Sequence, residues 1–468
     1  MSSQYAARSG LGRDIFGAAE LGDRRRTARL VETFDRMCAH PGGTLPDKLA
    51  SPPDLRGFYR LCGSDDVTHQ AILKPAQAYT LHRVKACPGD VLVLHDATEL
   101  DFTSITSIAG DLGQIGKGDH RGYLCHNVLA VEADSGEVLG LIDQVLHRRD
   151  EVSKDETLAR HRDRPTRESR LWVTGTQELP AEARLIDVAD QGADTFEFLE
   201  HECRSSRRFV IRAAKVRQVH AGHEPAGPRR ELKAYARDLP ELGRFTMDVQ
   251  AQPGRKARKD AEFIARAAAV LVTPPHAKAG LHGDDPLPLY VVQITEVSPP
   301  EGEKTIEWTL LTNERVETFE DALRVTGWYE RRWVVEEFHK AQKTGCRIED
   351  MQFTTTGRLE PAIALLSVVA VTLLNLREAG RRADAGTRRA DTLLSCEYVE
   401  VLSLKRYGEA RDDLTVREFF LALARLGGHQ NRKCDGHPGW MVLWRGWMKL
   451  QAMLDGYLAA QRKRCGKT

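Results

Sequence analysis

Neither sign of charge prevails in this chain of 468 residues. Lysine and arginine together number 68, and aspartate and glutamate 67, which leaves a formal net charge of +1. This balance excludes the argument that the chain as a whole is drawn to nucleic acid, so any such attraction must come from local clusters of cations. Hydrophobic residues at 41% and charged residues at 29% are typical of a soluble globular protein and exclude a disordered one.

Closely spaced cysteine pairs are also missing. The nine cysteines are scattered along the chain, and none forms a Cys-x-x-Cys pair. The odd number and the wide spacing argue against a disulfide framework and against a zinc knuckle. We therefore expect the cytosol as the compartment.

The sequence shows no signal peptide and no membrane span. Its first ten residues, MSSQYAARSG, contain no apolar core. The longest apolar run, 362–376, is interrupted by Ser367, Thr372 and Asn375, and it is shorter than the ~20 residues that cross a bilayer. This run predicts a buried helix.

Several familiar catalytic motifs are missing as well. There is no Walker A sequence and no Gly-x-Ser-x-Gly, and Gly116, Gly118 and Gly122 have the wrong spacing for a dinucleotide loop. His339 lacks the His-Glu-x-x-His arrangement of zinc proteases.

The length predicts two or three domains. We expect residues 1–70 to form a helical unit, with a helix over 12–38 that begins near the N-cap residue Asp23. Arg25 and Arg29 share one face of this helix, apart from its apolar stripe. After a break rich in proline and glycine, a second helical region runs to about Val84.

A run of expected strands follows. Residues 91–95 form an apolar strand that ends at Asp96, two further strands cover 123–132 and 137–147, and a helix over 167–178 precedes a strand that ends at Asp190. This β-β-β-α-β order, with acids at the ends of the first and fourth strands, is what a ribonuclease-H-like core requires. The predicted fold class is thus α/β.

The predicted catalytic domain spans 71–370, and a β-rich insertion over about 213–313 interrupts it. The insertion contains four strand-like runs between loops rich in proline and glycine. A helical C-terminal domain is expected over 371–468, with a capping box at Thr415 and Glu418. Six apolar residues repeat there at helical spacing: Trp440, Leu443, Trp444, Trp447, Leu450 and Leu454.

Four polar residues form the most informative pattern. On one α-helix Tyr329, Arg332, Glu336 and Lys343 fall within roughly 60° of one another. A carboxylate held among cations suits a metal ligand beside phosphates, although a surface helix laced with salt bridges explains the stripe equally simply. Asp96, Asp190 and Glu336 can meet at one edge of a sheet, and such hard oxygen ligands suit two Mg²⁺ ions, with Mn²⁺ as a substitute.

Taken together, these pieces resemble the DDE transposases of bacterial insertion sequences, in the subgroup with a Tyr-x2-Arg-x3-Glu-x6-Lys signature helix that includes the transposase of transposon five. The resemblance rests on six segments in the right order: LGDRRRTARLV from Leu21, HDAT from His95, ADQGAD from Ala189, IEWTLLT from Ile306, YERRWVVEEFHKAQKTG from Tyr329 and LARLGG from Leu423. The sequence departs from the family pattern at two positions. Gln191 stands after the second Asp, where members commonly carry Arg, and Ala97 stands after the first, where they commonly carry Thr. Both departures concern contacts around the metal ligands and not the ligands themselves.

The resemblance implies roles for individual residues. Asp96, Asp190 and Glu336 would be the catalytic, metal-binding triad. The DNA-binding residues it implies are Arg25, Arg29, Arg212, Trp308, Tyr329, Arg332, Lys340 and Lys343. Trp308 would stack on a flipped base, which offsets part of the cost of unstacking it; a place in the core of a β run explains this Trp as well.

Two further patterns leave alternatives open. Six lysines or arginines and no acid lie in 204–220, which suits either a phosphate rail or a solvated face. The tryptophan-rich repeat suits either the core of its own domain or the dimer interface that the family forms through this region.

The expected function is cut-and-paste transposition, in which strand cleavage, hairpin formation and strand transfer occur at transposon ends. Only metal-dependent phosphoryl transfer follows from the residues; the resemblance implies the hairpin. Expected partners are double-stranded DNA with terminal inverted repeats, target DNA and a second copy in a homodimer on DNA, with no membrane, in the nucleoid of a bacterial cytoplasm. The rivals are a catalytically silent, transposase-derived DNA-binding regulator and a nuclease that cuts without joining.

Overall fold

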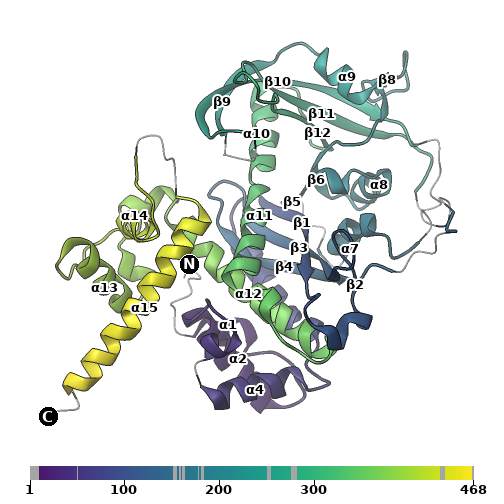
Figure 1. Ribbon diagram of the computed structural model, residues 1–468. Helices are drawn as coiled ribbons and strands as arrows, with labels where there is room; N and C mark the ends of the chain where they lie inside the picture. Colours follow the sequence, from purple (N-terminus) through teal and green to yellow (C-terminus); the bar gives the residue numbers. More distant parts are fainter. Residues whose placement is uncertain are drawn as a thin grey trace.

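One continuous sheet runs through the molecule (Figure 1). The computed structural model describes residues 10–49, 51–150, 155–157, 160, 164–177, 179–180, 184–249, 254–275, 282–432 and 438–465. Within them the sheet has 12 strands: β1 (Val91–Asp101), β2 (Gly113–Gln114), β3 (Arg121–Glu132), β4 (Val138–His147), β5 (Leu185–Ala189), β6 (Arg208–Arg212), β7 (Gln218–Ala221), β8 (Arg230–Glu231), β9 (Gly243–Val249), β10 (Arg258–Val272), β11 (Leu287–Glu296) and β12 (Glu307–Thr312).

Helices flank this sheet on both faces and at its ends. They are α1 (Leu11–Phe16), α2 (Arg24–Ala39), α3 (Leu45–Leu49), α4 (Pro52–Cys62), α5 (His69–Ala86), α7 (Leu171–Gln177), α8 (Phe196–Arg204), α9 (Leu232–Arg237), α10 (Phe319–Glu330), α11 (Trp333–Lys340), α12 (Thr356–Ala379), α13 (Cys396–Tyr407), α14 (Val416–Leu426) and α15 (Trp440–Cys465). A π-helical turn, η4 (Ala341–Gly345), follows α11.

Strand direction changes along the sheet. Its first half has the order β4-β3-β1-β5-β6, in which β4, β3 and β1 pair antiparallel and β1, β5 and β6 pair parallel. The central strands are covered on both faces, since α5 and α12 pack on β4, and α7 packs on β3 and β4. Double coverage explains why β1 and β5 appear in the sequence as continuous apolar runs.

The strands expected between 213 and 313 are present, but they do not form a separate layer. β12 pairs antiparallel with β6, so β12, β11, β10, β7 and β8 simply extend the sheet, and β9 joins at β10. Apolar residues of β10, β11 and β12 belong to the same two hydrophobic cores as residues of β5 and β6. Edge-to-edge pairing buries backbone groups that would otherwise stand open at β6.

The expected helix over 12–38 is two helices, α1 and α2, and this part of the prediction was wrong. Asp23 does cap α2, because its side chain accepts a hydrogen bond from the Arg25 amide. The segment before the cap turns back so that α1 packs on α2, with Phe16 and Phe34 in edge-to-face contact at 5.1 Å.

The apolar run over 362–376 lies within α12, and it is buried as expected. The stretch Thr356–Asn375 is long and apolar enough to cross a bilayer, yet 83% of it is buried inside the protein. Helices α2, α4, α5, α11 and α15 all contact it. The length of the apolar surface therefore reflects a central core helix that is covered by protein.

The C-terminal helices gather beside the sheet (Figure 1). The capping box at Thr415 and Glu418 begins α14 as predicted. On α15 five residues of the apolar repeat are buried within the chain: Trp440, Leu443, Trp447, Leu450 and Leu454. Trp444 is partly exposed and stacks on Trp440 at 5.4 Å. The repeat thus forms core in this chain, the first of its two sequence-based interpretations.

Candidate functional site

Strand register brings two of the three predicted acids together. The parallel pairing of β1 and β5 ends with His95 opposite Ala189, so the next residues, Asp96 and Asp190, lie at one level on adjoining strands about 4.8 Å apart. Strand alternation places Asp96 on the face where Leu94 packs in the core with α12. Asp190, the residue after β5, caps the turn that follows by accepting a hydrogen bond from the Gly192 amide at 2.8 Å. Contrary to the prediction, β1 does not end at Asp96 but continues to Asp101 along β3.

The third acid arrives on a helix that packs on β1. The prediction of one uninterrupted helix from Tyr329 to Lys343 was wrong: α10 ends at Glu330, α11 begins at Trp333, and the π-helical η4 follows. Between α10 and α11 the chain tightens, because the Arg332 amide bonds to the Tyr329 carbonyl three residues back. Glu336 in the first turn of α11 nevertheless faces β1.

Arg332 joins the acids at the centre of the site. Its Nη1 donates to Asp96 Oδ2 at 3.1 Å, and its Nη2 forms an ion pair with Glu336. The three side chains are largely buried, with exposed fractions of 14% for Arg332, 15% for Asp96 and 29% for Glu336. On the other side, the Arg332 guanidinium lies 6.0 Å from the Tyr329 ring centre.

Burial dominates the electrostatics of this site. It raises the pKa of Asp96 to about 7, against the lowering effect of Arg332, while the charges of Asp190 and Glu336 raise it further. Burial also raises the pKa of Tyr329 above its ordinary value. Because burial makes the charged form of Asp96 costly, a cation bound beside this carboxylate stabilises it.

The donor set suits a hard divalent ion. Three carboxylates and no sulfur or imidazole contribute, which is the chemistry that Mg²⁺ and Mn²⁺ select. Within the described residues, no three His, Cys, Asp or Glu side chains are gathered closely enough to hold an ion as they stand. The Arg332 guanidinium occupies the space between Asp96 and Glu336, so a metal ion there requires that Arg332 move aside.

A second ion cluster, which was not predicted, lies on the opposite face of the same strands. His95 Nε2 bonds to Asp187 Oδ1 at 2.8 Å, and Arg207 Nε donates to Asp187 Oδ2 at 2.8 Å, with His95 and Asp187 fully buried. This cluster ties β1 to β5 directly beneath Asp96 and Asp190. An Asp inside the apolar run Leu185–Ala189 was the signal, because a charge buried in a strand needs a partner.

A network of neutral side chains holds η4 against the sheet. Gln342 Nε2 donates to Ser367 Oγ of α12 at 2.7 Å, and Gln144 Nε2 of β4 donates to the same hydroxyl at 2.9 Å. Gln144 also donates to Asn127 Oδ1 at 2.7 Å, and Asn127 is the β3 partner of Asp96. The network therefore links the segment after Glu336 to the strand beside Asp96.

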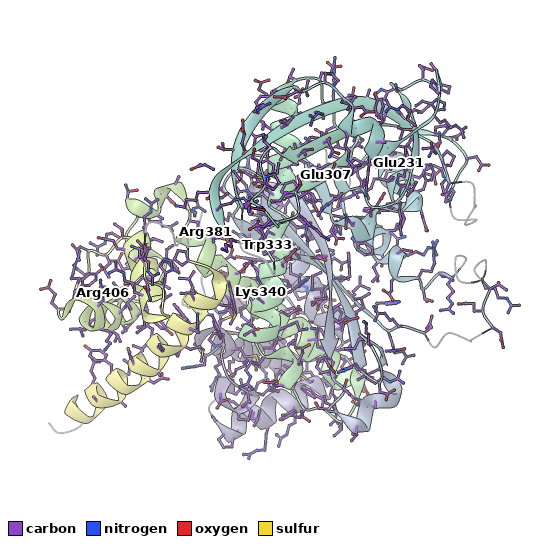
Figure 2. The ribbon with its side chains drawn as sticks, turned by 45° about the horizontal axis from the view of Figure 1, so that its top comes forward. Glu231, Glu307, Trp333, Lys340, Arg381 and Arg406 are labelled. Carbon is purple, nitrogen blue, oxygen red and sulfur yellow. The ribbon has the colours of Figure 1, made fainter. Side chains whose placement is uncertain are left out.

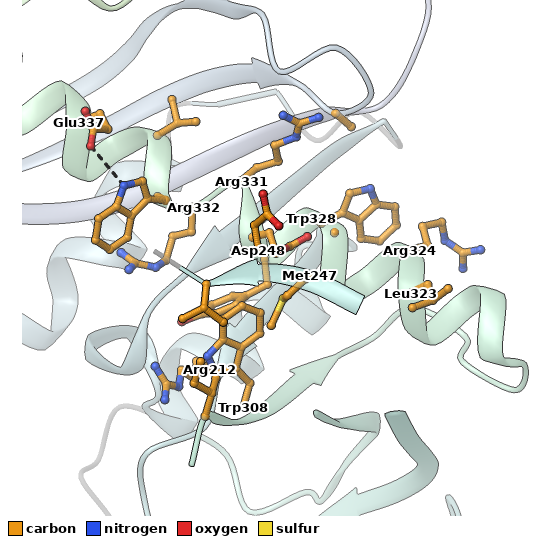
Figure 3. A pocket seen from close by; sticks show the side chains of 18 of the residues that line it. Arg212, Met247, Asp248, Trp308, Leu323, Arg324, Trp328, Arg331, Arg332 and Glu337 are labelled. Atoms are coloured by element: carbon orange, nitrogen blue, oxygen red, sulfur yellow. Dashed lines mark hydrogen bonds between the residues drawn. The ribbon is translucent and has the colours of Figure 1, made fainter. Parts of the chain in front are cut away.

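A cavity of about 1000 Å³ opens beside Arg332. Figure 3 shows Arg212 and Trp308 side by side in its wall, with Arg332, Arg331 and Trp328 also in it. The rings of Trp308 and Tyr329 meet edge to face at 5.1 Å. Trp308 is partly buried and also packs against the core, so both of its sequence-based interpretations describe part of its surroundings.

The two predicted lysines lie apart from the acids. Lys340 pairs with Glu337 at 2.9 Å and lies over the Trp333 ring, and Figure 2 shows Trp333 and Lys340 on α11. The Trp333 indole in turn donates to Glu337, the dashed line in Figure 3. Lys343 donates to the Glu99 carbonyl at 2.8 Å and pairs with Glu349, because the wide turn of η4 changes its direction.

Most arginines of the basic cluster over 204–220 form ion pairs with acids from other parts of the chain. Carboxylates pair with Arg204, Arg207, Arg208 and Arg217. Arg212 instead donates to the Glu307 carbonyl at 3.1 Å and lines the cavity. The pairing argues against a phosphate rail along the whole cluster and leaves Arg212 as its member nearest the site.

On the N-terminal helix the predicted cations differ in their surroundings. Arg25 is 91% exposed and pairs only with its neighbour Asp23 among the described residues. Arg29 is 39% exposed and shares the largely buried Asp54 with Arg36. Arg25 is therefore the freer of the two to meet a phosphate.

Comparison with known proteins gives two findings. A piggyBac transposase, solved by cryo-EM in a synaptic complex with hairpin DNA, is similar with a TM-score of 0.28 and 9% sequence identity over 87% of this chain. The match spans 61% of the piggyBac chain, and so distant a likeness gives no residue correspondence. Residues 12–67, which contain α1, α2, α3, α4 and the Arg25 and Arg29 cations, match the family model described as transposase DNA-binding.

Proposed function

We propose that the protein is a DNA transposase of the DDE type, similar to those of bacterial insertion sequences with the Tyr-Arg-Glu-Lys signature. The observation that carries the proposal is the strand register that brings Asp96 and Asp190 to the same level, with Glu336 joined to Asp96 through Arg332, in a chain whose residues 12–67 match the transposase DNA-binding model. A cavity lined by Arg332, Arg212 and Trp308 adjoins this group through Arg332, and a bent DNA end is its proposed occupant.

The proposed core is ribonuclease-H-like. The order β4-β3-β1-β5-β6, antiparallel and then parallel, supports this assignment, and the acids fall on β1, after β5 and on α11. The proposed division of the chain is a DNA-end-binding domain over 1–70, a catalytic domain over 71–370 with the β insertion over 213–313, and a helical C-terminal domain over 371–468 that carries the homodimer contact.

Asp96, Asp190 and Glu336 are the proposed holders of two Mg²⁺ ions, for which Mn²⁺ can substitute. When bound, such ions stabilise the charge that develops on attacking and leaving oxygens in phosphoryl transfer. The chain's own contribution is to orient: the β1–β5 ladder fixes two of the acids, and the packing of α11 on β1 fixes the third.

The proposed reaction begins when a water oxygen bonds to phosphorus and the bond to the 3′ oxygen breaks, which frees a 3′-hydroxyl. That hydroxyl oxygen then bonds to a phosphorus of the opposite strand, whose bond to the 3′ oxygen of the flanking DNA breaks, so a hairpin forms and the flank leaves. A second water breaks the new bond and restores the 3′-hydroxyl, which finally attacks a target phosphorus and displaces a 3′ oxygen of the target. Trp308, which is partly exposed and packs on the buried Tyr329 ring, is the proposed surface for an unstacked base. Arg212 and Arg332 face the phosphates, with Lys340 and Lys343 farther along, and Arg25 and Arg29 contact the terminal repeat.

The test replaces the acids one at a time, as Asp96→Asn, Asp190→Asn and Glu336→Gln. The substrate is DNA that carries the inverted repeats found on either side of the gene. Each variant is expected to bind the ends and to lose cleavage in Mg²⁺, whereas Glu320→Gln, an exposed acid on α10, keeps it. Full cleavage by any of the three triad variants contradicts the proposal.

The same assay separates the rival functions. A silent DNA-binding regulator binds the ends without cutting them, and a nuclease cuts without joining them to a target plasmid. Intact Asp96, Asp190 and Glu336 argue against the regulator, because a chain that only binds DNA gains nothing from three acids grouped beside its phosphate-facing cations.

A further inference from the structure

Arg332 makes two sets of contacts that compete for one guanidinium. Toward the sheet it bonds to Asp96 at 3.1 Å and to Glu336, the two acids that flank it. Toward the solvent it lines the cavity beside Tyr329, Trp308 and Arg212 (Figure 3). The side chain therefore stands at the boundary between the acids and the space that the proposed DNA end enters.

The contact with the acids satisfies charges that would otherwise repel. Three carboxylates on adjoining elements disfavour one another, and Asp96 is buried enough that leaving it unpaired is costly. A planar guanidinium matches two carboxylate oxygens at once. Arg332 Nη1 takes Asp96 and Nη2 takes Glu336, so the guanidinium stands where an ion bound by both acids would lie.

We infer that Arg332 is the built-in cation of the acid site in the DNA-free protein, which excludes divalent metal until a DNA phosphate draws the guanidinium into the cavity. The inference rests on the proposed function and adds a regulation of the same site. It fits the absence of a ready three-ligand metal cluster among the described residues.

A phosphate is a suitable rival for the guanidinium. Arginine binds phosphate and carboxylate with the same two-pronged geometry, so exchange of one for the other loses few hydrogen bonds. Arg212 lines the same cavity and adds a second cation toward the same phosphate. Once Arg332 has moved, Asp96 and Glu336 are left without a counter-ion and can close on a metal.

Linkage makes the consequence reciprocal. If DNA strengthens metal binding by some factor, metal strengthens DNA binding by the same factor. The protein would thus gather its metal only at a transposon end, which protects other DNA from cleavage.

The test measures Mn²⁺ binding directly, by titration followed with electron paramagnetic resonance, on the full chain without DNA. Arg332→Ala is expected to bind Mn²⁺ at least about tenfold more tightly than the unaltered protein, a difference of about 1.4 kcal/mol. The matched control is Arg331→Ala, which removes the same charge from the adjacent position. Arg331 bonds to the Asp134 carbonyl and not to the acids of the site. Arg332→Lys keeps the charge without the two-pronged contact, and an intermediate affinity is expected.

Three results would overturn the inference. One is an Arg332→Ala protein, folded by circular dichroism, that binds Mn²⁺ no more tightly than the unaltered protein. Another is an equal gain in Arg331→Ala, which would make the effect one of general charge. If Arg332→Ala fails to fold, Arg332→Lys decides: an affinity equal to that of the unaltered protein is the third.

The remaining arms test the coupling and the site separately. DNA that carries the flanking repeats is expected to tighten Mn²⁺ binding of the unaltered protein and to have little effect on Arg332→Ala; an equal effect on both overturns the coupling. Adding Asp96→Asn to Arg332→Ala is expected to abolish the gain. Tight Mn²⁺ binding that survives this change would place the metal elsewhere, and the proposed function would fail instead.

Discussion

Trp308 shows how one side chain can serve both the core and the cavity. Its ring is partly buried against the core of β12 and β11, and its edge meets Tyr329, which is buried in turn. Because Tyr329 also lies beside Arg332, the aromatic pair connects the cavity to the acids. A base laid on this pair would be held close to the reacting phosphate.

Truncation of this ring should separate two steps of the reaction. Trp308→Ala is expected to leave the first nick largely unchanged and to slow hairpin formation by roughly 5- to 150-fold, the value of a base–aromatic stack of about 1–3 kcal/mol. Gel analysis of end-bearing DNA measures both steps. Trp308→Phe, which keeps a ring, is the control and should retain most of the hairpin. Equal slowing of both steps would indicate a structural role only.

His339 on α11 makes folding sensitive to acid. Burial, and then the charges of Lys343 and Arg332, lower its pKa to about 3, and its Nε2 is shielded from water without a hydrogen-bond partner among the described residues. Below about pH 6.5 the unfolded chain takes up a proton here and the folded chain does not, so stability falls with pH in the window between these two values.

The expected loss from His339 is about 1.4 kcal/mol at about pH 5.5. Chemical unfolding of the unaltered protein and of His339→Met at about pH 7.5 and pH 5.5 measures it. The variant should lose less stability on acidification by that amount, and the comparison at the higher pH removes the effect of packing. An identical pH dependence in both proteins would exclude His339 as a source.

At the scale of elements, the sequence predicts where strands and caps lie better than how helices join. Alternation and apolar runs located β3, β4 and β5 to within a few residues, and the start but not the end of β1, because burial on a sheet leaves a period in the sequence. The single helix expected to carry both Tyr329 and Lys343 was wrong, because its interruptions leave no such period. A tightened turn at Arg332 and the wide turn of η4 depend on tertiary packing, which leaves no local signal.

The apolar strand pattern also predicted where the acids of the candidate site lie, but it did not predict that Arg332 is their counter-ion. Asp96 and Asp190 follow apolar strands, so their meeting follows from parallel pairing. The pairing of Arg332 with both Asp96 and Glu336 joins β1 to α11, two elements far apart in sequence. The salt-bridge interpretation of the stripe anticipates the pair of Arg332 with Glu336 on one helix, but nothing in a single sequence places Arg332 beside Asp96.

The neutral network that holds η4 gives a prediction at this scale. Ser367→Ala removes the acceptor shared by Gln144 and Gln342, and leaving buried amides without it should cost about 1–3 kcal/mol in the free energy of unfolding. Thr372→Val on the same helix removes a hydroxyl that bonds to its own helix backbone and weakly to the Cys38 thiol at 3.7 Å, and it should cost less than about 1 kcal/mol.

Denaturant unfolding of the two variants checks this difference. The double variant Ser367→Ala with Gln342→Leu should lose less than the sum of the single changes, because both act on one hydrogen bond. Strict additivity would show that Gln342 and Ser367 do not stabilise each other.

At the scale of the whole molecule, the positive and negative charges nearly cancel, so the electrostatic contacts that matter are local ones. Many arginines pair with acids inside the fold, as Arg207 and Arg217 do with Asp187 and Asp194. These pairs fix strands and loops and leave few cations free for DNA. The net charge of +1 gives no long-range attraction, so binding must depend on a small number of direct phosphate contacts.

Salt dependence can count those contacts. For duplex DNA with the flanking repeats, each neutralised phosphate contributes about 0.9 to the slope of log affinity against log salt concentration. Arg25→Gln should lower the slope by about that amount, because Arg25 is exposed and held only by a surface pair. The control is Arg230→Gln, because Arg230 on β8 forms a similar surface pair with Asp238; this change should leave the slope unchanged.

Arg29→Gln should change the slope less than Arg25→Gln, since Arg29 would have to leave Asp54 to reach a phosphate. A slope that does not respond to Arg25→Gln would move the DNA contact away from the start of α2, even though residues 12–67 match the DNA-binding model.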